Sequence, residues 1–259
     1  MNTIRIKGMI IRNLYVWVRD LDRVFDAFWW AFFDVVVWGM MSTYFARGNT
    51  MFIHQMLAGI IFWSILSRSQ WEISSSMLLE SWEKNLINIF ISPLTVAEYI
   101  TSSIFLGVAK LCMVICFMGA ITFGFYRFNI FTLNFWIIPL SASLFLTSIW
   151  SALIINSLIL RFGKRVMSFA WTLILIINPA SGVVYPITAL PRVLQIVSLF
   201  LPTSYIFTGA REILEKGTMD IRLLGISFVL NALYIFFGCM LYLRTFKKAR
   251  EHGWLIKLA

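Results

Sequence analysis

The segment 171–211 constrains the fold more than any other part of the sequence. An apolar run that is hydrophobic enough to enter a bilayer is followed by prolines, two of them in Leu-Pro steps at Pro191 and Pro202. Residues 190–211 are too interrupted for one continuous span, so we expect two short helices, each opened by a proline near its first turn. Broken helices persist at membrane depth only where protein or a water-filled cavity shelters the backbone. The segment is therefore typical of a transporter-like membrane protein rather than of a simple anchor.

Composition supports an all-α membrane protein that forms a single domain over 1–259. The chain is 60% hydrophobic and 13% charged, whereas soluble domains are about 45–50% apolar and about 25% charged. A hydrocarbon core of about 30 Å needs about 20 apolar residues per helix. We expect six transmembrane helices, near 24–46, 52–76, 98–124, 131–159, 166–187 and 223–244, with a short re-entrant helix pair over 190–215 before the last span.

Residues 4–20 have the pattern of an amphipathic helix that lies on the membrane surface. Arg5, Arg12 and Arg19 recur every seven residues and so share one face. The opposite face is apolar and consists of Ile6, Ile10, Leu14 and Trp17. This pattern predicts an N-terminal interfacial helix, although an ordinary basic N-terminal extension is the alternative.

Basic residues give the predicted orientation. Six spans place both termini on one side, and with the termini inside, fifteen of the 22 Lys and Arg residues lie in inner segments. Positive charge accumulates on the cytoplasmic side of membrane proteins, so we expect both termini, including the tail 245–259, in the cytoplasm. The net charge of +10 then reflects a basic face on an anionic leaflet, and no nucleic-acid partner is expected.

The inner loop between the second and third spans is unusually polar for this chain. Leu86, Ile89 and Phe90 stand at helical spacing within 80–92, and Pro93 ends the helix because the residue before a proline resists the helical conformation. A short amphipathic helix between two spans is well suited to dock against a soluble partner.

Three segments of the chain resemble the ABC-2 type permeases, the membrane subunits of type V ABC exporters. They are WEKNLINIFISPL at 82–94, SGVVYPITALPRVLQIVSLFLPTSYIFTGAR at 181–211 and FWWAFFDVVVWGMM at 28–41. The resemblance implies that 80–92 is a coupling helix inserted into a cleft of a separate ATP-binding subunit. Two residues depart from the family's Glu-Arg-Gly pattern, since Lys84 stands where Arg is common and Asn85 where Gly is usual. The implied coupling residues are Glu80, Glu83, Lys84, Leu86, Ile89, Phe90 and Pro93.

The same resemblance implies that the outer helices over 190–215 cap the exit of a translocation path. The residues that mark this region are Gly182, Pro186, Pro191 and Pro202. The implied assembly has two permease chains, as a homodimer or a heterodimer, and two ATPase subunits. No complete G-x-x-x-x-G-K-[ST] loop is present, because Gly163-Lys164 lacks the upstream Gly and the following Ser or Thr. We therefore expect no ATP hydrolysis and no cofactor in this chain, and ATP and Mg in the partner subunit.

Ionisable residues inside spans are costly, and they are functional candidates. Asp34 and Lys110 lie at similar predicted depths in parallel spans, so we hypothesise that they pair; separate polar partners, or a Lys110 that snorkels, are the alternatives. Arg68 and Glu72 are four residues apart and are placed to pair on one helix face. With only two His in the chain, we expect no metal site.

The sequence thus favours the transmembrane subunit of an exporter in the bacterial plasma (inner) membrane, acting on an amphipathic or lipid-linked substrate or drug. A non-transporting membrane anchor and a secondary transporter are alternatives. A membrane enzyme is disfavoured, because the acidic residues are dispersed rather than clustered. The substrate's identity stays open.

Overall fold

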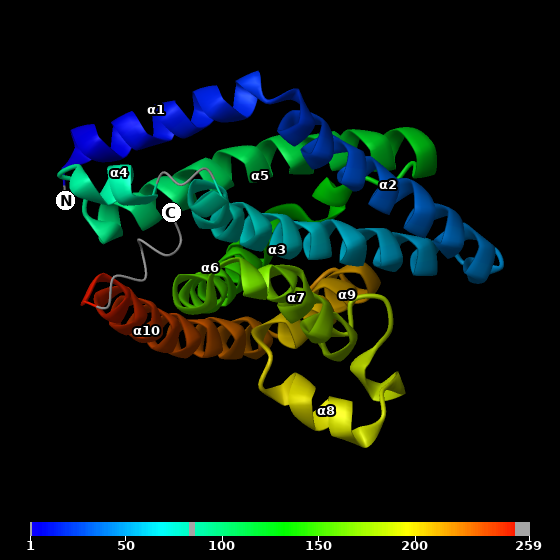
Figure 1. Cartoon of the computed structure of the whole chain (residues 1–259). Coiled ribbons are helices and arrows are strands. Elements are labelled where there is room, and N and C mark those ends of the chain that lie inside the picture. Colours follow the sequence, from blue (N-terminus) through cyan, green and yellow to red (C-terminus); the bar gives the residue numbers. More distant parts are fainter. Residues whose placement is uncertain (1, 83–85, 252–259) are drawn as a thin grey trace.

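The computed structural model describes residues 2–82 and 86–251 and is helical throughout its regular structure. Figure 1 labels the α-helices along the chain. The elements, in order, are α1 (Thr3–Arg19), α2 (Leu21–Ala46), α3 (Thr50–Trp82), α4 (Leu86–Ile91), α5 (Val96–Tyr126), the 3-10 helix η1 (Ile130–Trp136), α6 (Ile137–Phe162), the 3-10 helix η2 (Gly163–Val166), α7 (Met167–Ser181), the 3-10 helix η3 (Ile187–Ala189), α8 (Arg192–Leu199), α9 (Pro202–Lys216) and α10 (Ile221–Glu251).

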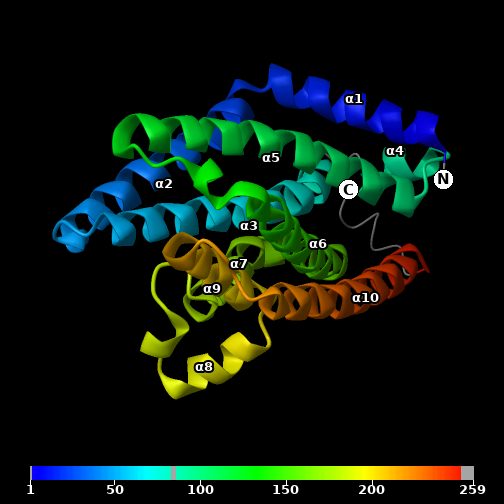
Figure 2. The ribbon, with the colours of Figure 1, turned by 180° about the vertical axis from the view of Figure 1, so that it is seen from behind.

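Helices α3 and α6 form the centre of the molecule. They pack against each other, α2 and α5 pack on α3, and α9 and α10 pack on α6. Figures 1 and 2 show the resulting arrangement, with α2 and α5 on one side of the central pair and α9 and α10 on the other. The main core includes Leu57 and Phe62 of α3, Leu144 of α6 and Phe207 of α9, all of them almost completely buried. Apolar residues elsewhere on the long helices stay exposed, as expected for surfaces that face lipid.

Five helical segments in the described residues are long and apolar enough to cross a membrane, and the bent α8–α9 pair raises this to as many as six. The predicted spans near 24–46, 52–76, 98–124, 131–159 and 223–244 correspond to these five. The structure therefore confirms an all-α membrane protein. Helices α3 and α10 are longer than predicted, and α10 includes the described part of the predicted tail.

The predicted fifth span differs from the structure. Instead of a helix over 166–187, α7 has 15 residues and ends at Ser181, because Gly182 adopts the left-handed conformation with φ of 68°. At 1.5 Å per residue this helix is about 22 Å long, which is short for a hydrocarbon core of about 30 Å. Residues beyond Gly182 are needed to complete a crossing.

The predicted pair of short helices is present as α8 and α9, which are bent by 98° relative to each other. Prolines begin both helices, as expected: Pro191 caps α8, and Pro202 is the first residue of α9. Proline fits these positions because the first N–H groups of a helix have no intrahelical acceptor.

Helix α1 confirms the helix predicted over 4–20, but it lies lengthwise along the first half of α5 (Figures 1 and 2). Contacts advance together along the two helices, from Asn2 with Glu98 to Trp17 with Lys110. A helix flat on a membrane surface would instead run across the spans. Of the predicted apolar face, Trp17 is buried whereas Leu14 is exposed.

Candidate functional site

One end of the molecule holds α4, the first turn of α1 and the last turns of α10 (Figure 1), and we call it the α4 end. Here α3 and α5 form a long hairpin whose tip is α4. The predicted helix over 80–92 falls on two described helices: Glu80 belongs to α3 and α4 begins at Leu86, while residues 83–85 are outside the described part of the chain. Beyond α4, Thr95 starts α5 with a capping box that it shares with Glu98.

Glu80 is bound within the chain rather than presented to a partner. Its two carboxylate oxygens accept hydrogen bonds from the Arg12 guanidinium at 2.5 and 3.1 Å, and the residue is buried. The pair fixes α1 to the end of α3, and the coupling role of Glu80 stays a prediction. Two-point contacts of this kind are geometrically specific.

Side chains of α4 and of the turn after it are partly buried and partly exposed. Ile89 is buried against Met9 and Tyr99, so in this chain its side chain meets the protein itself, and its coupling role stays a prediction. Ile91 is 77% exposed, and Asn88 and Pro93 are exposed too. Of the other predicted coupling residues, Glu83, Lys84 and the side chains of Leu86 and Phe90 lie outside the described part. Sequence reasoning missed Ile91, because periodicity alone does not tell which face of a short helix is covered.

Glu98 joins the beginning of α1 to the beginning of α5. It accepts hydrogen bonds from the backbone N–H of Asn2 at 2.7 Å and of Thr95 at 2.9 Å, and its carboxylate is 3.9 Å from the Arg5 guanidinium. Arg5 also donates to the carbonyl of Pro93. The α4 end is thus tied to α1 at Arg5 and Arg12, two of the three basic residues that the sequence placed on one face.

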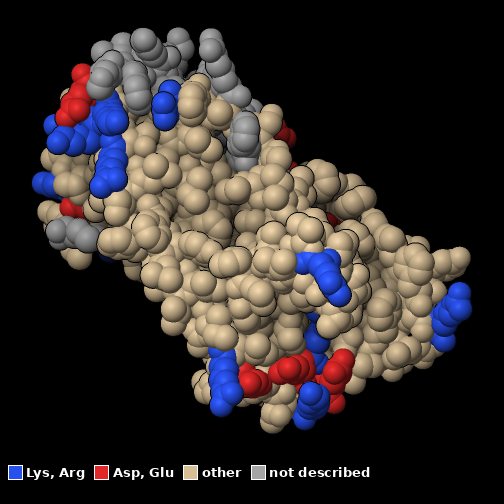
Figure 3. Space-filling model, turned by 90° about the horizontal axis from the view of Figure 1, so that it is seen from below, with Lys and Arg blue, Asp and Glu red and all other residues tan. Residues whose placement is uncertain are grey.

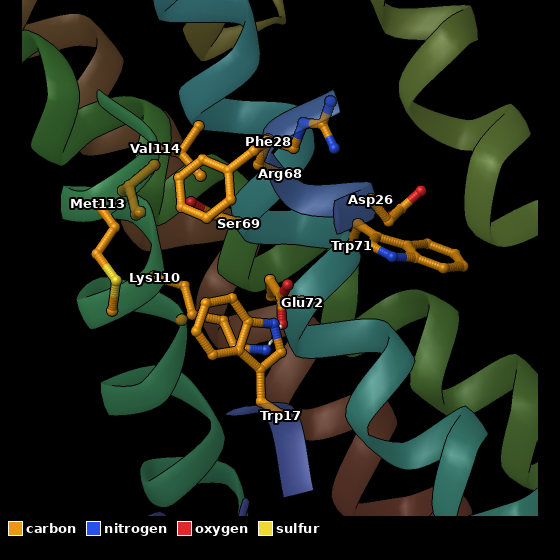
Figure 4. Close-up of a pocket in the computed structure, with 12 residues that line it drawn as sticks. Trp17, Asp26, Phe28, Arg68, Ser69, Trp71, Glu72, Lys110, Met113 and Val114 are labelled. Atoms are coloured by element: carbon orange, nitrogen blue, oxygen red, sulfur yellow. Dashed lines mark hydrogen bonds and ion pairs between the residues drawn. The ribbon is translucent and has the colours of Figure 1, made fainter. Parts of the chain in front are cut away.

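A second polar cluster lies deeper, where α1, α3 and α5 meet. The ammonium of Lys110 contacts the Glu72 carboxylate at 2.5 Å, and the Trp17 ring lies beside it with its centroid 5.0 Å from the nitrogen. Figure 4 shows these three side chains together at one side of a small cavity. The cavity has a volume of about 20 Å³ and is also lined by Arg68 and Asp26.

This arrangement corrects both hypotheses about charge pairs. Lys110 pairs with Glu72 of α3, while the positive charge that acts on Asp34 is Arg68 of α3. Arg68 and Glu72 do not form the i, i+4 pair, since Glu72 turns toward α5 and the Arg68 guanidinium points away from it (Figure 4). Lys110 thus has its ion-pair partner on α3, and the charge that acts on Asp34 lies on the same helix.

A third polar region surrounds the junction of α7, α8 and α9. The Arg211 guanidinium donates to the carbonyls of Gly182 and Val183, the latter at 3.1 Å. The Ser181 and Thr203 hydroxyls are 2.6 Å apart and join the end of α7 to the first turn of α9. These contacts satisfy backbone that the α7 break would leave exposed in a bilayer. Gly182 therefore has a clear role as a helix terminator.

The three prolines that mark this region in the sequence lie where the backbone changes direction. Pro186 precedes η3 with extended backbone angles, and Pro191 and Pro202 begin the next two helices. The role of Arg211 was not predicted from the sequence. Its position offered a signal, because an arginine within a predicted re-entrant segment needs a partner such as a backbone carbonyl.

Helices α6 and α10 are joined by a buried hydrogen-bonded group centred on Asn231. Its amide accepts from Thr147 at 2.9 Å and from the Trp150 indole at 3.1 Å, and it donates to the carbonyl and hydroxyl of Ser143. Ser227 then links Ser143 to the carbonyl of Pro202 at 2.9 Å. This group connects the break before α9 to the central helix α6.

Across the described residues, no group of three or more His, Cys, Asp and Glu side chains is placed to hold a metal ion. The polar groups instead join particular elements: Arg12 and Lys110 tie α1 and α5 to α3, Arg211 ties the turn after α7 to α9, and Asn231 ties α10 to α6. Long apolar helices, a bent helix pair and ionisable residues within the candidate spans together define a multi-pass membrane protein of the transporter class.

The comparison with protein families identifies the class more closely. Residues 6–214 match the family model described as ABC-2 type transporter. The chain therefore belongs to the ABC-2 type transporter family, and it is the transmembrane component of an ABC transporter. The membrane domains of this family work with ATP-binding subunits. No curated protein matches the sequence.

Proposed function

We propose that this chain is the permease subunit of an ABC exporter that moves an amphipathic or lipid-linked substrate, or a drug, out of a bacterial cell. Two such chains, as a homodimer, form the translocation path in the inner membrane, and a separate ATP-binding subunit with bound Mg and ATP drives it. Both termini lie in the cytoplasm, so the α4 end is the cytoplasmic end and the α8–α9 pair lies on the outer side.

The observation that carries this proposal is the length of the α3–α4–α5 hairpin. Helix α3 has 33 residues and α5 has 31, whereas about 20 residues cross the hydrocarbon core. The excess of more than ten residues projects on the order of 15 Å beyond the membrane at 1.5 Å per residue. A rigid projection with a short helix at its tip is suited to transmit movement from a soluble subunit.

The exposed side of α4 supplies the contact. Ile91 is 77% exposed at the tip of the hairpin, while Arg12, Arg5 and Ile89 fix that tip to α1 and α5. These contacts offer a route by which a force applied at Ile91 reaches both long helices and α1.

The test is co-purification of the tagged chain with its ATP-binding subunit from the native membrane, with ATPase activity measured in the same preparation. Ile91→Asp is expected to reduce the recovered subunit and its activity at least about tenfold, since a charge enters an apolar contact. Ile221→Asp is the matched control, because Ile221 is also highly exposed but lies at the opposite end of α10. Recovery of the chain without any ATPase under conditions that preserve other ABC complexes would favour a membrane anchor or a secondary transporter.

A further inference from the structure

A groove lies between α8, α9 and the first turn of α10, away from the α4 end. Its volume is about 540 Å³, within the range of about 300–1,000 Å³ that is typical of small-molecule sites. One wall is α8 and the opposite wall is α9. The lining residues are Ile187, Arg192, Gln195, Ile196, Ser198, Leu199, Ser204, Tyr205, Thr208 and Leu223.

Arg192 supplies the charge of this groove. In the described part of the chain it has no ion pair, and no Asp or Glu is among the lining residues. The neighbouring hydroxyls are already used on the backbone: Ser204 donates to the Ser198 and Leu201 carbonyls, and Tyr205 donates to that of Leu199. The groove therefore offers an uncompensated positive charge, which favours an anionic ligand.

Most of the remaining groove surface is apolar, although uncharged polar side chains also contribute to it. Ile196 and Leu199 line it and are 59% and 60% exposed. Figures 1 and 2 both show α8 standing away from the rest of the helices. From below, the surface is largely uncharged between charges that gather at its ends and along one edge (Figure 3). A free anion needs the charge but not these apolar walls.

We propose that this groove binds an anionic phospholipid taken from the bilayer. The Arg192 guanidinium contacts the phosphate, and an acyl chain lies along Ile196, Leu199 and Leu223. The concave shape favours a lipid over a second copy of the chain, because a protein surface would have to insert a narrow projection between α8 and α9. This inference requires insertion in a membrane and does not depend on the proposed export function.

The test uses the full-length chain, purified in detergent and stripped of lipid, and native mass spectrometry to count bound lipids. Phosphatidylglycerol and phosphatidylcholine with identical acyl chains are the probes. We expect one phosphatidylglycerol per chain to bind more tightly than the others, and Arg192→Gln to weaken that binding about tenfold or more, as for loss of a hydrogen bond to a charged group. Binding of phosphatidylcholine should be weaker from the start and change less, because its choline cation offsets the charge of its phosphate.

Matched variants separate charge, shape and folding. Arg222→Gln removes an exposed arginine from the first turn of α10 outside the groove lining, and it should leave lipid binding unchanged. Arg192→Lys should restore part of the binding, whereas Ile196→Ser should weaken both lipids. The proposal is overturned if Arg192→Gln and Arg222→Gln behave alike, if inorganic phosphate displaces the lipid at equal concentration, or if Arg192→Gln abolishes a dimer while lipid binding persists.

Discussion

At the scale of single residues, Lys110 and Glu72 form a largely buried ion pair, and such pairs respond asymmetrically to mutation. Lys110→Met leaves the Glu72 carboxylate without the cation 2.5 Å away. Because an uncompensated buried charge costs more than the loss of the whole pair, we expect destabilisation of about 3 kcal/mol. Glu72→Gln combined with Lys110→Met should recover a large part of that loss. Thermal unfolding in detergent, followed by tryptophan fluorescence, measures both variants.

Asp34 provides the control for this pair. The cation that acts on Asp34 is Arg68, which also interacts with Glu72, the partner of Lys110. Asp34 and Lys110 are therefore connected only through these neighbours, and the coupling between Asp34→Asn and Lys110→Met should be smaller than that between Glu72→Gln and Lys110→Met. Equal or larger coupling would contradict the structure and restore the pairing predicted from sequence.

Asn231 gives a second prediction at this scale. Replacing it by Leu leaves the Thr147 hydroxyl and the Trp150 indole without the acceptor that they share. Hydrogen bonds between membrane helices contribute about 0.6 kcal/mol on average, with a maximum near 1.7, so loss of several should cost roughly 2 kcal/mol. Asn156→Leu is the matched control and should cost less, because the Asn156 oxygen has no partner and its amide makes one bond of 3.4 Å. Equal melting temperatures for the two variants would refute this ranking.

At the scale of elements, the turn after α7 packs directly on α3. A methyl group added at Gly59 would overlap the Val183 carbonyl oxygen, which Arg211 also binds. Since backbone rather than a flexible side chain must move, Gly59→Ala should destabilise the protein by about 1–3 kcal/mol. Gly225→Ala, with open space around it, should be neutral or slightly stabilising because alanine favours a helix. Thermal unfolding compares the two, and a stable Gly59→Ala variant would mean that the turn does not lie against α3.

Helix α1 should detach more easily when its ionic contact is removed. Arg12→Gln breaks the two-point contact with Glu80, whereas Arg19→Gln changes an exposed residue at the other end of the same helix. We expect faster hydrogen exchange over α1 in the Arg12 variant, at least about tenfold, and little change in the Arg19 variant. Equal exchange rates over α1 in the two variants would show that the other contacts of α1, with Glu98 and through Met9 and Trp17, hold the helix without the Arg12–Glu80 pair.

At the scale of the whole molecule, the sequence predicted the elements better than their contacts. Local signals sufficed where a residue acts on its own backbone, as with Pro202 at the start of α9 and Pro191 before α8. The partners of Lys110 and Glu80 were not predictable, because they depend on how each helix is rotated about its axis. An apolar residue such as Ile89 reads the same whether it faces a soluble partner or the protein interior. Hydrophobic periodicity therefore predicts where helices form, but it does not predict which face of a helix packs against which neighbour.

The short helix α7 poses the remaining question of topology, and the geometry around it predicts the answer. Although α7 is only about 22 Å long, the backbone that follows it is sheltered. Ser181 and Val183 are buried, and Arg211 binds the Gly182 and Val183 carbonyls. Irregular backbone at membrane depth is tolerated under such shelter, so we expect the chain to complete its crossing between Ser181 and η3.

Single cysteines in a cysteine-free background test this crossing, with a membrane-impermeant maleimide applied to intact and permeabilised cells. Helix α10 is long and apolar enough to cross a membrane, so Lys216→Cys and Glu251→Cys serve as markers for its two sides. We expect Ala189→Cys to label together with Lys216→Cys in intact cells, and Ser168→Cys to label with Glu251→Cys only after permeabilisation. If Ser168→Cys and Ala189→Cys label on the same side, α7 does not cross. In that case the bent α8–α9 pair would have to supply the sixth span. With only five spans, the basic N-terminal and C-terminal segments would lie on opposite sides of the membrane, against the preference of basic residues for one side.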